Sequence, residues 1–199
     1  MIRDFQDSIN DSRQLRSLHR HCAEELRLPG EYSDLLRMSI VYCMSAFDKL
    51  IHDMVIYGMV ETFAGRRQAT PTYLNEGISL DNHLELTSSS VPPPEIIFAG
   101  IVRRKLSHQS FMDPKKLAGA LSLVWSENHK WQVIADAMGR NQKQVIKELR
   151  NIYQRRNAIV HETDKNPSTN QKMPILTVDS ERIESFILEL GETIYQLVM

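Results

Sequence analysis

The sequence predicts an all-α fold, a single-domain helical bundle, and three observations support this. Apolar residues recur at intervals of three and four over several long segments, as they do in amphipathic helices. Proline and glycine fall mainly between those segments, where they end helices. No stretch alternates polar and apolar residues in the manner of a strand. Because 199 residues suffice for one good core, one domain is expected over 1–199.

The first two predicted helices are separated by a Pro-Gly pair. A polar helix is expected over Phe5–Leu28, ending at Pro29. A longer helix is expected over Tyr32–Ala64, with Gly65 in the position of a C-terminal cap. Its apolar residues recur at helical spacing: Ile40, Val41, Met44, Phe47, Ile51, Met54, Val55 and Met59.

The middle of the chain is punctuated by Pro71, the serines 88–90 and the prolines 92–94, so additional short helices are expected there. The predicted helices after Gly65 are 79–86 (SLDNHLEL), Glu95–Leu106, Pro114–Trp125, Trp131–Met138, Asn141–Ile159 and Ser180–Val198, with a polar loop over Asp164–Pro174. The expected bundle core is 31–64 together with 141–198, and 65–140 is expected as a helical insert.

Composition excludes several classes of protein. The formal net charge of −1 gives no general attraction to nucleic acid or anionic lipid, so any such contact needs a local basic patch. Cys22 and Cys43 are the only cysteines and form no CxxC motif, which favours a reduced protein without a zinc site. The first residues lack a signal-peptide pattern, and the apolar stretches are too short to span a bilayer. A cytoplasmic protein with no membrane contact, metal or cofactor is expected.

One passage also fits a helix-turn-helix. In residues 131–149, WQVIADAMGRNQKQVIKEL, Gly139 stands between two apolar-periodic segments, and the second carries Arg140, Lys143 and Lys147. A DNA-binding regulator is therefore one alternative. A plain antiparallel helix pair is favoured, because the second segment continues without a break into the next polar motif.

That motif, YQRRNAIVHE at 153–162, places polar groups on a core-facing stripe. Counting by three and four from Leu149 through Ile152 leads to Arg156. A buried guanidinium needs an acid or a ligand nearby. Asp48 interrupts the apolar stripe of the second helix in the same way, so Asp48 is predicted to approach Arg156 and hold it.

Asn157 and His161 stand four residues apart and so share one helix face, whereas Arg156 lies about 140° around the helix from His161. Arg156 and His161 can reach one small group if the arginine bends, the helix frays or a second chain contributes. An arginine followed five residues later by a histidine occurs three times in the sequence: Arg16–His21, Arg103–His108 and Arg156–His161. Only the last has the adjacent asparagine, the preceding apolar-periodic helix, a following acid at Glu162 and an exit loop that contains Asp164 and Pro167.

Two segments point to a known family. Residues 155–167, RRNAIVHETDKNP, resemble the RNxxxH signature of HEPN domains, an all-α superfamily with many ribonucleases. Residues 45–55, SAFDKLIHDMV, resemble the equivalent segment of the RiboL-PSP branch of that superfamily. The order of helices between the two segments also fits, so the resemblance covers most of the chain.

The resemblance implies a metal-independent endoribonuclease that works as a homodimer through its motif-bearing helices. Arg156 and His161 match the two defining positions, and Asn157 matches the polar position after the arginine. A histidine side chain, which titrates near pH 6.5 in water, serves as general acid or base at neutral pH, and an arginine clamps phosphate oxygens. Arg155, Glu162 and Asp48 are the expected supporting residues, with Arg155 gripping flanking backbone if exposed. RNA cleavage by the 2′-OH should leave 2′,3′-cyclic phosphates.

The resemblance also suggests a setting, as a toxin or antiphage-defence effector, with an antitoxin or other partner protein. Besides the nuclease and the helix-turn-helix regulator, a third hypothesis stays open at this point. A HEPN module that binds RNA, a nucleotide or a protein without catalysis would use the same residues to hold a phosphate.

Overall fold

The computed structural model describes residues 1–88 and 91–199, and these residues are helical without a β-strand; an isolated bridge joins Lys165 and Lys172. The all-α prediction is therefore confirmed. Ser89 and Ser90, which belong to the predicted serine break, lie outside the described residues. The helices are α1 (Ile2–His19), a π-helical turn η1 (Arg20–Glu25), α2 (Ser33–Phe63), α3 (Pro71–Leu74), α4 (Leu80–Ser88), α5 (Pro94–Leu106), α6 (Pro114–Ser122), α7 (Lys130–Ala137), α8 (Gln142–His161) and α9 (Thr177–Val198).

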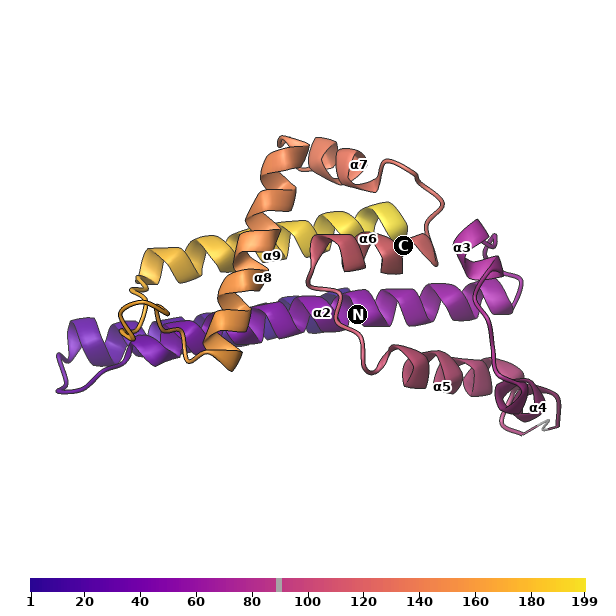
Figure 1. Ribbon diagram of the computed structural model, residues 1–199, viewed down its shortest axis with the longest axis horizontal. Helices are drawn as coiled ribbons and strands as arrows, with labels where there is room; N and C mark the ends of the chain where they lie inside the picture. Colours follow the sequence, from indigo (N-terminus) through magenta and orange to yellow (C-terminus); the bar gives the residue numbers. More distant parts are fainter. Residues whose placement is uncertain (89–90) are drawn as a thin grey trace.

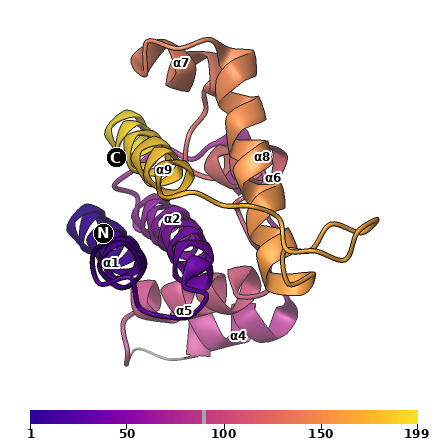
Figure 2. The same cartoon turned by 90° about the vertical axis from the view of Figure 1, so that its left-hand side faces the viewer.

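The long helix α2 is the axis of the molecule (Figure 1). Seen along that axis in Figure 2, α1, α9, α8 and α5 surround it, and α8 crosses it steeply rather than running alongside. The apolar face of α2 supplies many of the fully buried side chains, including Phe47, Ile51 and Met54. The helix that carries the RNxxxH-like motif is thus held against the centre of the fold.

One hydrophobic core extends through most of the chain. It includes Phe5 and Ile9 of α1, and it also includes Phe98, Leu117 and Ile134 from the segment expected as a helical insert. Burial at this level is worth about 1.5–3 kcal/mol for each large side chain. The segment 65–140 therefore packs as part of one compact domain with the central helices.

The first predicted helix differs from the structure in its second half. Regular α-helix ends at His19, and a π-helical turn follows over Arg20–Glu25. None of the residues of this turn is buried, so no packing against the core holds them in a regular α-helix. The short helix Pro71–Leu74 was not predicted; Thr70 begins it by accepting a hydrogen bond from the backbone N–H of Tyr73.

The helix pair formed by α7 and α8 turns at Gly139, whose φ of +63° favours glycine. Asn141 then caps α8 by accepting hydrogen bonds from the backbone N–H groups of Lys143 and Gln144. Arg140 is paired with Glu148 and Glu189, at 3.5 and 2.6 Å. Because Arg140 is held by two acids, it is not a free base-reading side chain of the kind the helix-turn-helix alternative requires.

Candidate functional site

The motif helix α8 ends at His161 in a tight reversal of the chain. The backbone N–H groups of Glu162 and Asp164 both donate to the carbonyl oxygen of Ala158. Thr163 and Asp164 have φ values of +54° and +56°, a left-handed conformation that is unfavourable for a β-branched threonine. A conformation of this kind persists only where the surrounding contacts enforce it.

The contacts that enforce the reversal converge on Asp164, which is fully buried. Its Oδ2 atom accepts hydrogen bonds from Arg37 Nε at 2.7 Å and from Arg155 Nη2 at 2.8 Å. Its backbone carbonyl accepts a hydrogen bond from the N–H of Met173, which closes the loop after α8. One carboxylate thus ties together the start of α2, the end of α8 and the following loop, and fixes where His161 lies.

The prediction that Arg155 grips flanking backbone applies to an exposed side chain, whereas the structure pairs this side chain within the fold. Its side chain is only 21% exposed, and Nη2 is shared between Asp164 and the carbonyl oxygen of Pro174. Removing a partner from a buried ion pair leaves an uncompensated charge, which is strongly unfavourable. Arg155, which precedes the RNxxxH-like residues, therefore helps to hold the end of α8 in place.

The predicted contact between Asp48 and Arg156 is also absent. Asp48 Oδ1 instead accepts a hydrogen bond from the backbone N–H of Phe111 at 2.6 Å, and Oδ2 lies 3.9 Å from His52 Nδ1. Asp48 anchors the loop between α5 and α6, because that loop presents a backbone donor close to the acid. The apolar stripe of α2 correctly indicated that Asp48 needs a partner, but the partner is the backbone of Phe111 and not Arg156.

Arg156 lies on the core-facing side of α8 as predicted, half-buried and without an acid within ion-pair distance among the described residues. Its Nε atom is buried and has no hydrogen-bond partner. Its Nη1 atom donates to Asn157 Oδ1 at 3.2 Å, so the guanidinium bends towards its neighbour. A half-buried cation in this state retains unused hydrogen-bonding capacity for an anion.

Asn157 is half-buried and His161 is exposed, one turn apart on the same face of α8. The hydrogen bond from Arg156 to Asn157 joins the arginine to that face, which partly bridges the angular separation between Arg156 and His161. Glu162 is exposed at the end of the helix, and its carboxylate has no described partner. Arg156, Asn157 and His161 thus lie on the last turns of α8, whereas Arg155 and Asp48 are paired with other parts of the fold.

Sequence reasoning missed Arg37 as a partner in this region. Arg37 stands three residues before Ile40 on the apolar stripe of α2, and it is buried with 5% exposure. Arg37, like Arg156 and Asp48, is a charged residue on an apolar helical stripe, so this signal was present in the sequence. Asp164 gave no comparable signal, because it stands in a polar loop where an aspartate is ordinary.

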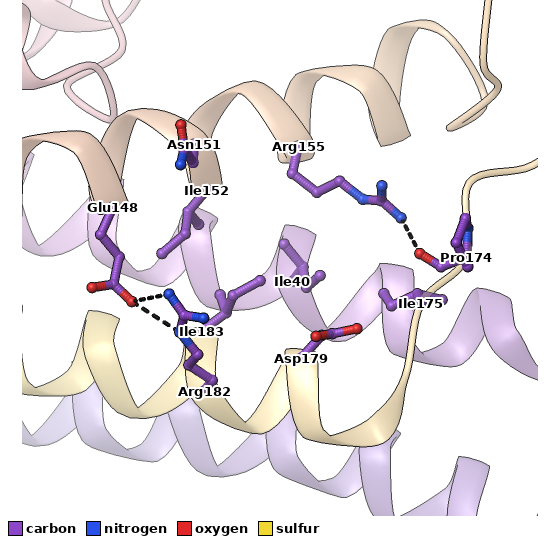
Figure 3. A pocket seen from close by; sticks show the side chains of 10 residues that line it. All are labelled: Ile40, Glu148, Asn151, Ile152, Arg155, Pro174, Ile175, Asp179, Arg182 and Ile183. Atoms are coloured by element: carbon purple, nitrogen blue, oxygen red, sulfur yellow. Dashed lines mark hydrogen bonds and ion pairs between the residues drawn. The ribbon is translucent and has the colours of Figure 1, made fainter.

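A pocket of about 270 Å³ lies beside α8, between it, α9 and the loop after α8 (Figure 3). Its apolar lining includes Ile40 and Ile152. Arg155 points across it to Pro174, and Arg182 and Glu148 face each other at its other end. Arg156, Asn157 and His161 do not line this pocket. Of the predicted site residues on α8, only Arg155 lines this pocket.

Within the described residues, no three His, Cys, Asp or Glu side chains are grouped so that they could hold a metal ion. None of the described helices combines the length and apolar character needed to cross a lipid bilayer.

Comparison of the chain with protein-family models, with curated proteins and with solved structures finds no match. The resemblance to HEPN domains accordingly depends on the motif in α8, the segment in α2 and the order of the helices.

Proposed function

We propose that this protein is an endoribonuclease of the HEPN type that needs no metal ion and uses Arg156, Asn157 and His161. The observation that carries the proposal is the contrast between adjacent arginines. Arg155 is satisfied by a buried acid, whereas Arg156 has no acid and bends towards the face that bears Asn157 and His161. A guanidinium without an acidic partner, on the same end of a helix as an exposed histidine, suits a phosphodiester.

In the proposed reaction, the ribose 2′-oxygen attacks the adjacent phosphorus. The bond from that oxygen to phosphorus forms as the bond from phosphorus to the 5′-oxygen breaks. A histidine base takes the proton of the 2′-OH, and a histidine acid gives a proton to the leaving 5′-oxygen. Arg156 stabilises the charge that develops on the non-bridging oxygens, and Asn157 orients the guanidinium. The products are a 2′,3′-cyclic phosphate and a 5′-hydroxyl.

One chain supplies one such histidine, so the proposal includes a dimer that brings two copies of α8 together. A dimer then provides a His161 for each proton transfer. An exposed apolar side chain is available for such a contact within the motif, since Val160 is 43% exposed. We place the site between copies for these reasons.

The test uses end-labelled single-stranded RNA in excess EDTA, with products resolved on a denaturing gel. The parent should cut RNA and leave cyclic-phosphate ends, and His161→Ala should reduce the rate by ~10²–10⁴ while retaining the fold. His108→Ala is the matched control, because Arg103–His108 has the same spacing as Arg156–His161. Equal loss in both variants, or equal activity in His161→Ala and the parent, would refute the site assignment.

Binding without cleavage is the second candidate function, and the same unpaired Arg156 favours it, since a guanidinium can hold a phosphate without any proton transfer. RNA binding by the parent with no product after long incubation, also with added Mg²⁺, would establish the binding module instead. His161→Ala should then bind RNA as tightly as the parent.

A further inference from the structure

The outer face of α8 carries basic side chains that the fold does not use. Lys143, Lys147 and Arg150 are all exposed, and none forms an ion pair or a side-chain hydrogen bond with another described residue. Elsewhere on this side of the molecule the fold does pair its cations, since Arg140 and Arg182 both contact Glu148. These three charges therefore do not contribute to holding the helices together.

The three basic residues align with the motif. Lys143, Lys147, Arg150 and Gln154 precede Asn157 and His161 at intervals of four, three, four, three and four. At about 100° per residue, all six positions fall within a sector of about 80°, and the line from Lys143 to His161 is about 27 Å long. We call this set of residues the basic stripe: Lys143, Lys147, Arg150, Gln154, Asn157 and His161.

No acid on α8 neutralises the basic stripe. Glu148 is the one acidic residue of α8, against five lysines and arginines. Figure 3 shows that Glu148 points towards Arg182 at the pocket, and hydrogen bonds of 3.1 and 3.2 Å join their side chains. Lys143, Lys147 and Arg150 thus form a local group of unpaired positive charges, although the chain as a whole has a formal net charge of −1.

We propose that the basic stripe is a track for the phosphate backbone of single-stranded RNA, which leads the strand along α8 to His161. This inference rests on the proposed function for the identity of the substrate and deepens it by naming how the strand is held. Lys143, Lys147 and Arg150 each contact a phosphate, and they act without reading the bases. The stripe contains no aromatic or aliphatic side chain that would anchor a protein partner.

A track of this kind makes binding depend on salt. Each phosphate contact to a single strand contributes about −0.7 to the slope of log K against log salt, so three contacts contribute about −2. Neutralising the stripe should therefore weaken binding at least about tenfold at 0.1 M salt. The difference should shrink towards 1 M salt.

The experiment compares two triple variants in full-length protein carrying His161→Ala, so that the RNA stays intact. The stripe variant is Lys143→Gln, Lys147→Gln and Arg150→Gln. The control variant is Lys115→Gln, Lys116→Gln and Arg103→Gln, which removes the same charges at exposed positions on α5 and α6 whose side chains are also unpaired. The dissociation constant for a fluorescent single-stranded RNA is measured from 0.05 to 0.5 M salt, and thermal melts verify the fold of each variant.

The track is supported if the stripe variant binds RNA more weakly and shows a shallower slope of log K against log salt, while the control variant matches the parent in both. Unchanged binding in the stripe variant, or an equal loss in the two variants, would overturn it. A preference of the parent for duplex DNA that the stripe variant loses would replace the track by a DNA-reading helix. The unmodified protein, with His161 intact, is assayed for RNA cleavage in parallel. If it does not cut RNA but the stripe variant still loses RNA affinity, the proposed nuclease is refuted and the track stands.

Discussion

Arg155 Nη2 lies 2.8 Å from the fully buried carboxylate of Asp164, whereas the next residue, Arg156, has no acid within ion-pair distance among the described residues. Of these two adjacent arginines, one thus forms an ion pair with a buried acid and the other does not. The first is part of the structure that shapes the end of α8, and the second is paired with Asn157 alone among the described residues.

This contrast predicts different outcomes for two otherwise equal substitutions. Arg155→Ala should lower the free energy of unfolding by about 1–3 kcal/mol, because it leaves part of the hydrogen-bonding capacity of Asp164 unsatisfied. Arg156→Ala should change the free energy of unfolding by less than about 1 kcal/mol, because no ion pair is lost. Urea unfolding measures both, and RNA cleavage should be lost in Arg156→Ala. The reverse order of stabilities would contradict the assigned roles.

Asp164 should be among the polar residues on which stability depends most. Asp164→Ala leaves Arg37 and Arg155 without their shared acid, and breaking a buried pair in this way costs about 3–5 kcal/mol. Asp7→Asn is the control, because Asp7 is an exposed acid without a described partner. A melting temperature of Asp164→Ala equal to that of the control would show that the loop reversal does not depend on this carboxylate.

The two cysteines should differ in reactivity. Burial raises the pKa of the Cys43 thiol above its ordinary value of 9.0, so the reactive thiolate is scarce at neutral pH, whereas Cys22 is partly exposed. A thiol reagent at pH 8 should modify one thiol per native chain and two after denaturation. Cys22→Ser should then leave no rapidly reacting thiol. Fast modification of both native thiols would show that the core around Cys43 opens readily.

Because the unfolded chain ionises this thiol more easily than the native chain, the same pKa shift makes stability depend on pH. The contribution of buried Cys43 is fully present below about pH 9 and is lost as pH rises above that value. The free energy of unfolding should therefore decrease from pH 8 to pH 10. The change in the free energy of unfolding between pH 8 and pH 10 should be smaller in Cys43→Ala than in the parent, whatever the stability of that variant at pH 8.

The proposed dimer predicts that a charge at Val160 will weaken self-association. Val160→Asp introduces a carboxylate into an apolar contact beside the motif, where it would be desolvated. Val178→Asp is the matched control, since Val178 is also exposed but stands at the start of α9. Sedimentation velocity should show a dimer for the parent and the control and a monomer for Val160→Asp. A monomeric parent would refute the shared site.

Helical spacing in the sequence was enough to predict most helices and the place of Arg156 on the core-facing side of α8. Local patterns determine these features, because burial of an apolar stripe and a cap such as Asn141 act within one helix. The partners of Asp48 and Arg155 could not be predicted in this way. They depend on which backbone group or side chain from a distant segment lies nearby, Phe111 in one case and Asp164 in the other.

The most direct measurement maps where the parent cuts a single-stranded RNA in EDTA and then replaces only the ribose at that position by 2′-deoxyribose. Attack by the 2′-OH predicts that cleavage at the mapped position disappears, that cleavage elsewhere continues, and that the original product ends in a 2′,3′-cyclic phosphate. No cleavage of RNA by the parent, or cleavage that persists at the deoxyribose, would contradict RNA cleavage by the 2′-OH at Arg156, Asn157 and His161.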